Sequence, residues 1–183
     1  MKLEVLDKDY IYHIYNRGIN GETIFFNDEN KKYFLHLIDK YLHNKCDVYA
    51  YCLMDNHFHI LFTVTCENDI VTQGLSNMFN AYAKAFNKSN NRTGSLFEKH
   101  FKRIRITDEH YLRKLIVYIH LNPKHHFDID FTNFKYSSYK SFLTDRETKL
   151  KRNYVLELFG GKENFVFLHQ QKNDILNDQL ALE

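Results

Sequence analysis

Two histidines, His57 and His59, stand two residues apart in a stretch rich in apolar and β-branched residues. Residues 57–64 are predicted to form a β-strand, in which side chains two residues apart point to the same face. The opposite face of this strand is wholly apolar and predicts contact with a core. Neighbouring neutral imidazoles are common ligands of divalent metals. The pair therefore indicates a metal site, with a purely structural role as the alternative.

A second pair, Tyr118 and Asn122, stands four residues apart where apolar residues recur at helical spacing. On an α-helix this spacing places both side chains on the same side. The amide oxygen of Asn122 could complete a site for Mg²⁺ or Mn²⁺ beside the two imidazoles, and the phenol of Tyr118 could attack a phosphate held there. Most tyrosines on helices only pack or lie on the surface, so the spacing alone does not make Tyr118 a nucleophile.

The elements that must position these residues follow the order strand, helix, strand, strand, helix, strand. The predicted strands cover residues 10–17, 47–54, 57–64 and 100–106, and the predicted helices cover residues 28–44 and 69–88. This α+β order is typical of the ferredoxin-like split βαβ sandwich, an antiparallel four-stranded sheet with two helices on one face. Because the apolar face of the histidine strand must meet those helices, we expect His57 and His59 on the open face, within reach of a substrate.

A third helix, which carries the tyrosine, is predicted to begin after a cap at Thr107 or Asp108. We expect it to run to the Asn122–Pro123 pair, because proline disfavours helical conformation in the residue before it. The division that results is a domain over residues 1–143, which includes this helix, and a C-terminal helical extension and tail over residues 144–183.

The C-terminal part of the chain has weaker patterns. Short helices are predicted over residues 136–143 and 154–159, with a break at Gly160–Gly161, and the tail from Lys172 is expected to be disordered.

Charge is concentrated in one segment of a chain whose net charge is only +2. Seven lysines and arginines lie between Lys84 and Arg105 with a single acid, Glu98, so this segment carries +6 and the remainder −4. Such a segment indicates a surface that binds a polyanion, with a solvated charged surface as the alternative. No apolar run reaches the length of a membrane span, no signal peptide is recognisable, and the three cysteines predict reduced thiols in a cytoplasmic protein.

Several motifs, in this order and spacing, resemble those of one protein family. They are Tyr12-His13, Asn16-Arg17-Gly18, the run from Tyr51 to His59, the run from Gly94 to Glu98, Phe101-Lys102, the run from Tyr118 to Pro123, and the run from Tyr136 to Tyr139. Across residues 10–143, and more weakly to about residue 168, the chain resembles the single-tyrosine HUH-endonuclease transposases (IS200-like), especially the branch associated with repetitive extragenic palindromes.

The resemblance implies cleavage of DNA by transesterification. His57 and His59 would bind Mg²⁺ or Mn²⁺, and Tyr118 would be the nucleophile, forming a 5′-phosphotyrosine and releasing a 3′-OH. Asn122 would take the place where many members carry glutamine, one methylene longer. The third ligand therefore stays open between Asn122 and its neighbours His120, His125 and His126.

The implied partner is single-stranded or hairpin DNA, bound by a monomer or homodimer in the cytoplasm. The residues expected to contact phosphates are Arg17, Lys102, Arg103 and Arg105. The alternative function is a nucleic-acid-binding module or regulator on the same fold that does not cleave. That alternative has no need of His57, His59 and Tyr118 together. Two roles for residues 144–183 stay open, namely additional DNA binding and simple packing of the third helix.

Overall fold

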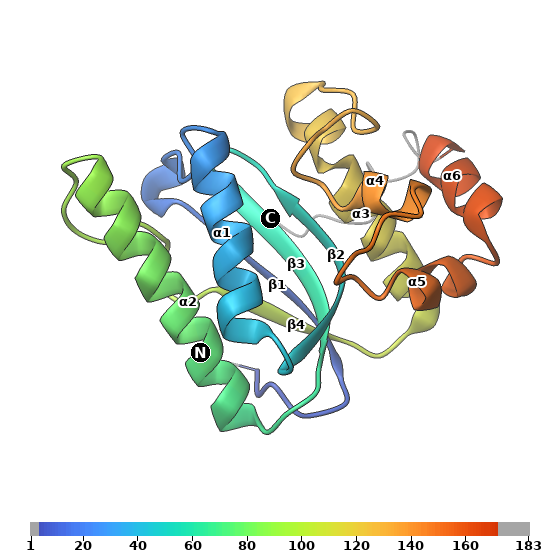
Figure 1. The fold of residues 1–183 in the computed structure, drawn as a ribbon, viewed down its shortest axis with the longest axis horizontal. Coiled ribbons are helices and arrows are strands. Elements are labelled where there is room, and N and C mark those ends of the chain that lie inside the picture. Colours follow the sequence, from blue (N-terminus) through green and yellow to red (C-terminus); the bar gives the residue numbers. More distant parts are fainter. Residues whose placement is uncertain (1–3, 172–183) are drawn as a thin grey trace.

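The computed structural model describes residues 4–171, so the predicted disordered tail from Lys172 lies outside the described residues. It has an α+β fold built around one four-stranded sheet (Figure 1). The elements in chain order are β1 (Ile11–Arg17), a short 3₁₀ turn (Ile19–Gly21), α1 (Asp28–Leu42), β2 (Cys46–Leu53), β3 (His57–Val64), α2 (Asn68–Ser89), β4 (Lys102–Ile106), α3 (Glu109–Phe127), α4 (Tyr139–Leu143), α5 (Arg152–Leu158) and α6 (Lys162–Gln171).

The strands are ordered β2-β3-β1-β4, and every neighbouring pair is antiparallel. This confirms the predicted ferredoxin-like arrangement. His59 of β3 lies directly opposite Tyr15 of β1, and Tyr15 lies opposite Lys102 of β4. Residues directly opposite in neighbouring strands share a face, so these three side chains form one row across the sheet.

One face of the sheet is covered by α1 and α2, as predicted. The side chain of Asn27 accepts a hydrogen bond from the Asn30 amide and caps α1, while the apolar stripe of the helix faces the sheet. Phe58, Ile60 and Phe62 of β3 are fully buried beneath these helices. This first core absorbs the apolar face of the histidine strand.

The other face of the sheet is not open, and on this point the sequence-based expectation was wrong. The sheet lies between α1 and α2 on one side and α3 with the C-terminal helices on the other (Figure 1). Leu61 and Ile106 of the sheet pack with Leu115, Ile116 and Ile119 of α3 in a second core. The apolar residues that β3 and β4 alternate onto this face need burial as much as those on the first face, and α3 supplies it.

Helix α3 continues through Pro123 to Phe127, so the predicted end at the Asn122–Pro123 pair was also wrong. Proline removes one helical hydrogen bond, because it has no N–H to donate to the carbonyl of Ile119. The turn continues because Pro123 is buried and tertiary packing overrides the local preference. Asp128, in the left-handed conformation, ends the helix, and its N–H donates to the carbonyls of Lys124 and Pro123.

The C-terminal region adds to the second core. The helix predicted over residues 136–143 is shorter, because residues 136–138 instead lie along the edge of β2, where the Leu53 amide donates to the Tyr136 carbonyl. The helix predicted at 154–159 is α5, and α6 was not anticipated. Val155 and Phe165 of this region are fully buried against α3, so residues 144–171 pack the third helix. Of the helices in residues 4–171, none has both the length and the apolar character that a membrane span requires.

Two fully buried histidines in the second core, His120 and His169, make stability depend on pH. Burial lowers the pKa of His169 to about 4 and holds that of His120 well below its usual range. The unfolded chain binds protons on these groups below about pH 6.5, whereas the folded chain does not. The free energy of unfolding should therefore fall as the pH falls from 7 to 5, by up to about 1.4 kcal/mol per pH unit for each such histidine.

Urea unfolding at pH 7, 6 and 5 measures this slope. His169→Gln, whose amide can still form hydrogen bonds but cannot be protonated, should reduce this slope, whereas His36→Gln at an exposed position should leave it as in the wild type. A slope unchanged by His169→Gln would contradict the assignment of acid sensitivity to this histidine.

Candidate active site

His57 and His59 lie side by side on the face of β3 that α3 covers. Their rings are edge to face with centroids 5.3 Å apart. They are only 9% and 2% exposed, so both lie in a cavity beneath α3 rather than on an open sheet surface. The alternation of the strand placed them correctly on one face, but α3 closes that face over them.

The structure brings Tyr118 and Asn122 of α3 onto the same two histidines. The rings of Tyr118 and His59 are edge to face at 5.7 Å between centroids. The Oδ1 atom of Asn122 lies 3.4 Å from Nε2 of His57, and its Nδ2 donates to the Tyr118 carbonyl at 2.9 Å. The four residues predicted to carry the chemistry are thus assembled from β3 and α3.

The ring nitrogens of the two histidines are oriented by different partners. Nδ1 of His57 lies 2.7 Å from Oδ1 of Asn56, so it must be the protonated nitrogen that donates to this amide oxygen. Nδ1 of His59 lies 2.9 Å from Nε2 of His13. In both rings the nitrogen that faces α3 is therefore Nε2.

The donor set fits a divalent cation. Nε2 of His59 is buried and has no hydrogen-bond partner among residues 4–171, as expected for a nitrogen whose lone pair is reserved for a ligand. Burial, together with the neighbouring His13 and His57, holds the pKa of His59 well below its usual range, so its imidazole is neutral. In the described part of the chain no three His, Cys, Asp or Glu side chains converge to hold a metal. The Asn122 amide oxygen is the oxygen atom that lies 3.4 Å from Nε2 of His57.

The three neighbouring histidines of α3 separate in space. His120 points away from the site, toward Ser138 and His169. The ring of His126 lies 4.9 Å from that of His57 and lines the cleft that leads to the site. Burial lowers the pKa of His125, which is not among the residues that line this cleft.

A cleft of about 350 Å³ opens beside the histidines. It is lined by Tyr15, Asn16, Arg17, Asn56, His57, His59, Glu98, Lys102, His126 and Phe127. Arg17 and Lys102 place positive charge at this cleft, and Nε of Arg17 forms an ion pair of 2.6 Å with Oε1 of Glu98. The cleft therefore opens onto the two histidines, and its walls carry two cations and one carboxylate.

The other two predicted phosphate contacts, Arg103 and Arg105, are not brought to this cleft. In β4 the pleat turns them to the face opposite Lys102, where they lie across from Ile14 and Tyr12. Arg103 stacks on the ring of Phe101, and Arg105 stacks on that of Tyr10. Lys102, Arg103 and Arg105 are close in the sequence and were therefore expected to act together. Side chains alternate along β4, however, so Lys102 lies on one face of the sheet and the two arginines lie on the other.

His13 and Asn56 are the neighbours of the site that the sequence analysis did not select. His13 shares a face of β1 with Tyr15 and Arg17, and β1 pairs with the histidine strand. The alternation of side chains along β1, combined with the predicted pairing of the two central strands, could have indicated that His13 lies beside the histidines of β3. Asn56 directly precedes His57. Its contact with the His57 ring could not be recognised without knowing the direction of the Asn56 side chain.

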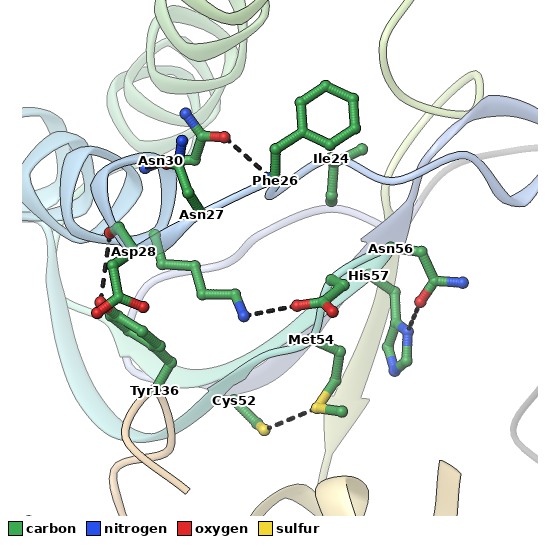
Figure 2. Close-up of polar contacts among 12 residues, drawn as sticks. Ile24, Phe26, Asn27, Asp28, Asn30, Cys52, Met54, Asn56, His57 and Tyr136 are labelled. Carbon is green, nitrogen blue, oxygen red and sulfur yellow. Dashed lines mark hydrogen bonds and ion pairs between the residues drawn. The ribbon is translucent and has the colours of Figure 1, made fainter. Parts of the chain in front are cut away.

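The turn before His57 is held by contacts from several parts of the chain. Figure 2 shows the Asn56 amide directed at the ring of His57. The carbonyl of Asp55 accepts from the amides of Ile24 and Phe25, and its carboxylate forms a 2.6 Å ion pair with the largely buried Lys31. These contacts fix the entry of β3 and hence the position of the first histidine.

Comparison with known proteins gives one family and one similar fold. The family model described as "Transposase IS200 like" matches residues 7–122. A solved structure of "the REP associates tyrosine transposase bound to a REP hairpin" matches with a TM-score of 0.63 and 15% sequence identity, covering 78% of this chain and 84% of that chain. No curated protein matches the chain. At this identity the structural likeness shows a shared fold.

Gly18 gives a test of how the site is held. Its amide donates to the Asn56 carbonyl at 2.8 Å, and a Cβ added there would lie 1.9 Å from the Glu22 carbonyl oxygen. Gly18→Ala should therefore destabilise the fold by about 1–3 kcal/mol and shift the NMR signals of the His57 ring, because the backbone must move. Urea unfolding and histidine NMR measure the two effects.

The matched control is Gly21→Ala in the same turn. Gly21 has a positive φ of 74° but nothing within 4 Å of an added Cβ, so its substitution strains only the local backbone. It should leave the His57 signals in place. Equal shifts of those signals in both variants would contradict the close contact at Gly18 as the cause.

Proposed function

This chain belongs to the family of IS200-like transposases, and we propose that it cuts and rejoins single-stranded DNA next to hairpins. The observation that carries the proposal is the convergence of Tyr118 and Asn122 of α3 on His57 and His59 of β3. A phenol beside two imidazoles, with a cleft next to them that is lined by Arg17 and Lys102, suits attack on a phosphodiester.

Three side chains would hold the divalent cation, Mg²⁺ or Mn²⁺. They are His57 and His59 through Nε2, and Asn122 through Oδ1. When bound, the cation supplies Lewis acidity to a non-bridging phosphate oxygen. Asn56 and His13 would keep the two Nδ1 atoms engaged, so that both Nε2 lone pairs face the site.

Tyr118 is proposed to perform the covalent step. Its phenolic oxygen forms a bond to phosphorus while the bond from phosphorus to the 3′ oxygen breaks. The phenolic proton is lost and the 3′ oxygen gains a proton, which leaves a 5′-phosphotyrosine and a free 3′-OH. A 3′-OH that later attacks this phosphotyrosine reverses the step, so the strand can be resealed without a separate energy source.

Arg17 and Lys102 are the proposed phosphate contacts, because both line the cleft beside the histidines. Arg103 and Arg105 are left out of this proposal, since they lie on the other face of the sheet. The hairpin as substrate is supported by the solved relative of the same fold, which is described as bound to a REP hairpin.

The proposed catalytic residues and the C-terminal extension would lie in separate parts of the chain. Residues 1–143 would carry the catalytic constellation, and residues 144–183 would form the extension. The four central residues belong to one chain, so a monomer suffices, and a homodimer is compatible with the same site. The protein would act on DNA in the cytoplasm.

The first prediction for this function concerns the covalent adduct. Protein mixed with labelled hairpin DNA, including the flanks of its own gene, should form a protein–DNA band on denaturing gels with Mg²⁺ or Mn²⁺. Tyr118→Phe, His59→Ala and a chelator should each abolish it, because they remove the nucleophile, a ligand or the cation.

Tyr111→Phe is the matched control, since it removes a second phenol of α3, which is half-buried, and should keep the adduct. An adduct that persists in Tyr118→Phe would move the nucleophile elsewhere. Tight and specific DNA binding with no adduct under either metal would favour the alternative, a binding module that does not cleave.

The second prediction concerns the cleft cations. Lys102→Gln should weaken binding to single-stranded DNA and lower the slope of log K against log salt by about 0.7, the value for one lost phosphate contact. Arg103→Gln, one residue along β4 but on the opposite face, should leave that slope unchanged. Fluorescence anisotropy across a salt series measures the DNA affinity of both variants. An equal loss of affinity in the two variants would refute the assignment of the cleft as the place where phosphates bind.

A further inference from the structure

We propose that His120, Ser138 and His169 are positioning residues, which hold the nucleophile helix through a buried chain of hydrogen bonds and so set the place of Tyr118. The inference rests on the proposed function for what Tyr118 does. The C-terminal region and the motif from Tyr136 to Tyr139 have no part in the proposed chemistry. This inference gives both of them a role.

The chain of hydrogen bonds joins three separate elements. Nε2 of His120 on α3 lies 2.8 Å from Oγ of Ser138, and its Nδ1 lies 2.9 Å from Nε2 of His169 on α6. Nδ1 of His169 in turn lies 2.7 Å from the carbonyl of Phe165. The three linked side chains are all 0% exposed, so water does not compete for these bonds.

One assignment of protons gives each ring nitrogen of the two histidines a hydrogen-bond partner. The Ser138 hydroxyl donates to Nε2 of His120, the Nδ1–H of His120 donates to Nε2 of His169, and the Nδ1–H of His169 donates to the Phe165 carbonyl. Both histidines are then neutral and carry their proton on Nδ1. A complete buried network of this kind specifies one relative position of its members.

Ser138 connects the network to the sheet. Its Oγ accepts from the Tyr51 amide at 2.9 Å, and its own amide donates to the Tyr51 carbonyl at 3.0 Å. Residues 136–138 thus run along the edge of β2, paired there through Leu53 as well. The network is therefore anchored to the same sheet that carries the metal-site histidines.

Helical geometry makes this anchor relevant to the nucleophile. Tyr118 and His120 are two residues apart, so they point about 200° apart around α3. Tyr118 faces His59 on the sheet, while His120 faces Ser138 and His169. Helix α3 is therefore held by contacts on two opposite sides. Loss of the hydrogen bonds to His120 lets the helix rotate or shift, and this changes the distance from the Tyr118 phenol to the phosphate.

The first test needs neither DNA nor metal. In protein labelled with ¹⁵N-histidine, His120 and His169 should both give the signature of the Nδ1–H tautomer, and His169→Leu should change that of His120. In the same variant, amide exchange should become faster in residues 116–122 of α3 and stay unchanged in β1. Nε2–H tautomers on both rings, or unchanged exchange in α3, would overturn the proposal.

The second test measures the rate of adduct formation and the affinity for hairpin DNA separately. His169→Leu should slow single-turnover adduct formation by about 10- to 100-fold, while the dissociation constant for DNA stays within about twofold, because only the placement of the phenol changes. His169→Gln keeps an acceptor for the His120 proton and should recover much of the rate.

The matched control is Val155→Ala, which removes buried apolar volume from the same C-terminal region without touching a hydrogen bond of the network. It should lower the melting temperature at least as much as His169→Leu and keep the wild-type rate. If both variants slow the reaction in proportion to their loss of stability, the histidines are only structural. If the wild type forms no adduct at all, the proposed function fails, and the tautomer and exchange measurements still decide whether the network holds α3.

Discussion

The packing of α3 on the second face of the sheet is the contact on which the rest of the molecule depends. Without it the histidines of β3 would lie on an open surface, and Tyr118 would have no fixed relation to them. The contact is mainly apolar, and burial of apolar area is a strong but non-directional force. It brings the helix onto the sheet, but it does not by itself fix rotation or register.

Direction comes from polar groups placed around this apolar contact. On the side that faces the sheet, Nδ2 of Asn122 donates to the Tyr118 carbonyl, and its Oδ1 lies 3.4 Å from Nε2 of His57. On the far side, His120 is linked to Ser138 and His169. Buried polar groups are costly unless they are paired, so only positions of α3 that pair them are stable. The same physical rule explains why both ring nitrogens of the buried His120 and His169 have partners.

The two faces of the sheet differ in what they bury. The face beneath α1 and α2 holds a continuous core that includes Phe58 and Phe62. The other face combines a core near its middle with a polar cavity at one end, where the row of His59, Tyr15 and Lys102 crosses the strands. Because each strand alternates between the faces, one short segment such as β3 serves both purposes.

The sequence by itself determined the order of the elements, the shared face of His57 and His59, and the shared side of Tyr118 and Asn122, because periods of 2 and 3.6 residues are local properties of the chain. Only the tertiary structure decided that the second face is covered, that α3 continues through Pro123, and that His13 and His169 meet their partners. The two histidine pairs, His13 with His59 and His120 with His169, join residues 46 and 49 positions apart. Such contacts arise from packing rather than from any local pattern, because no short window of the sequence contains both partners.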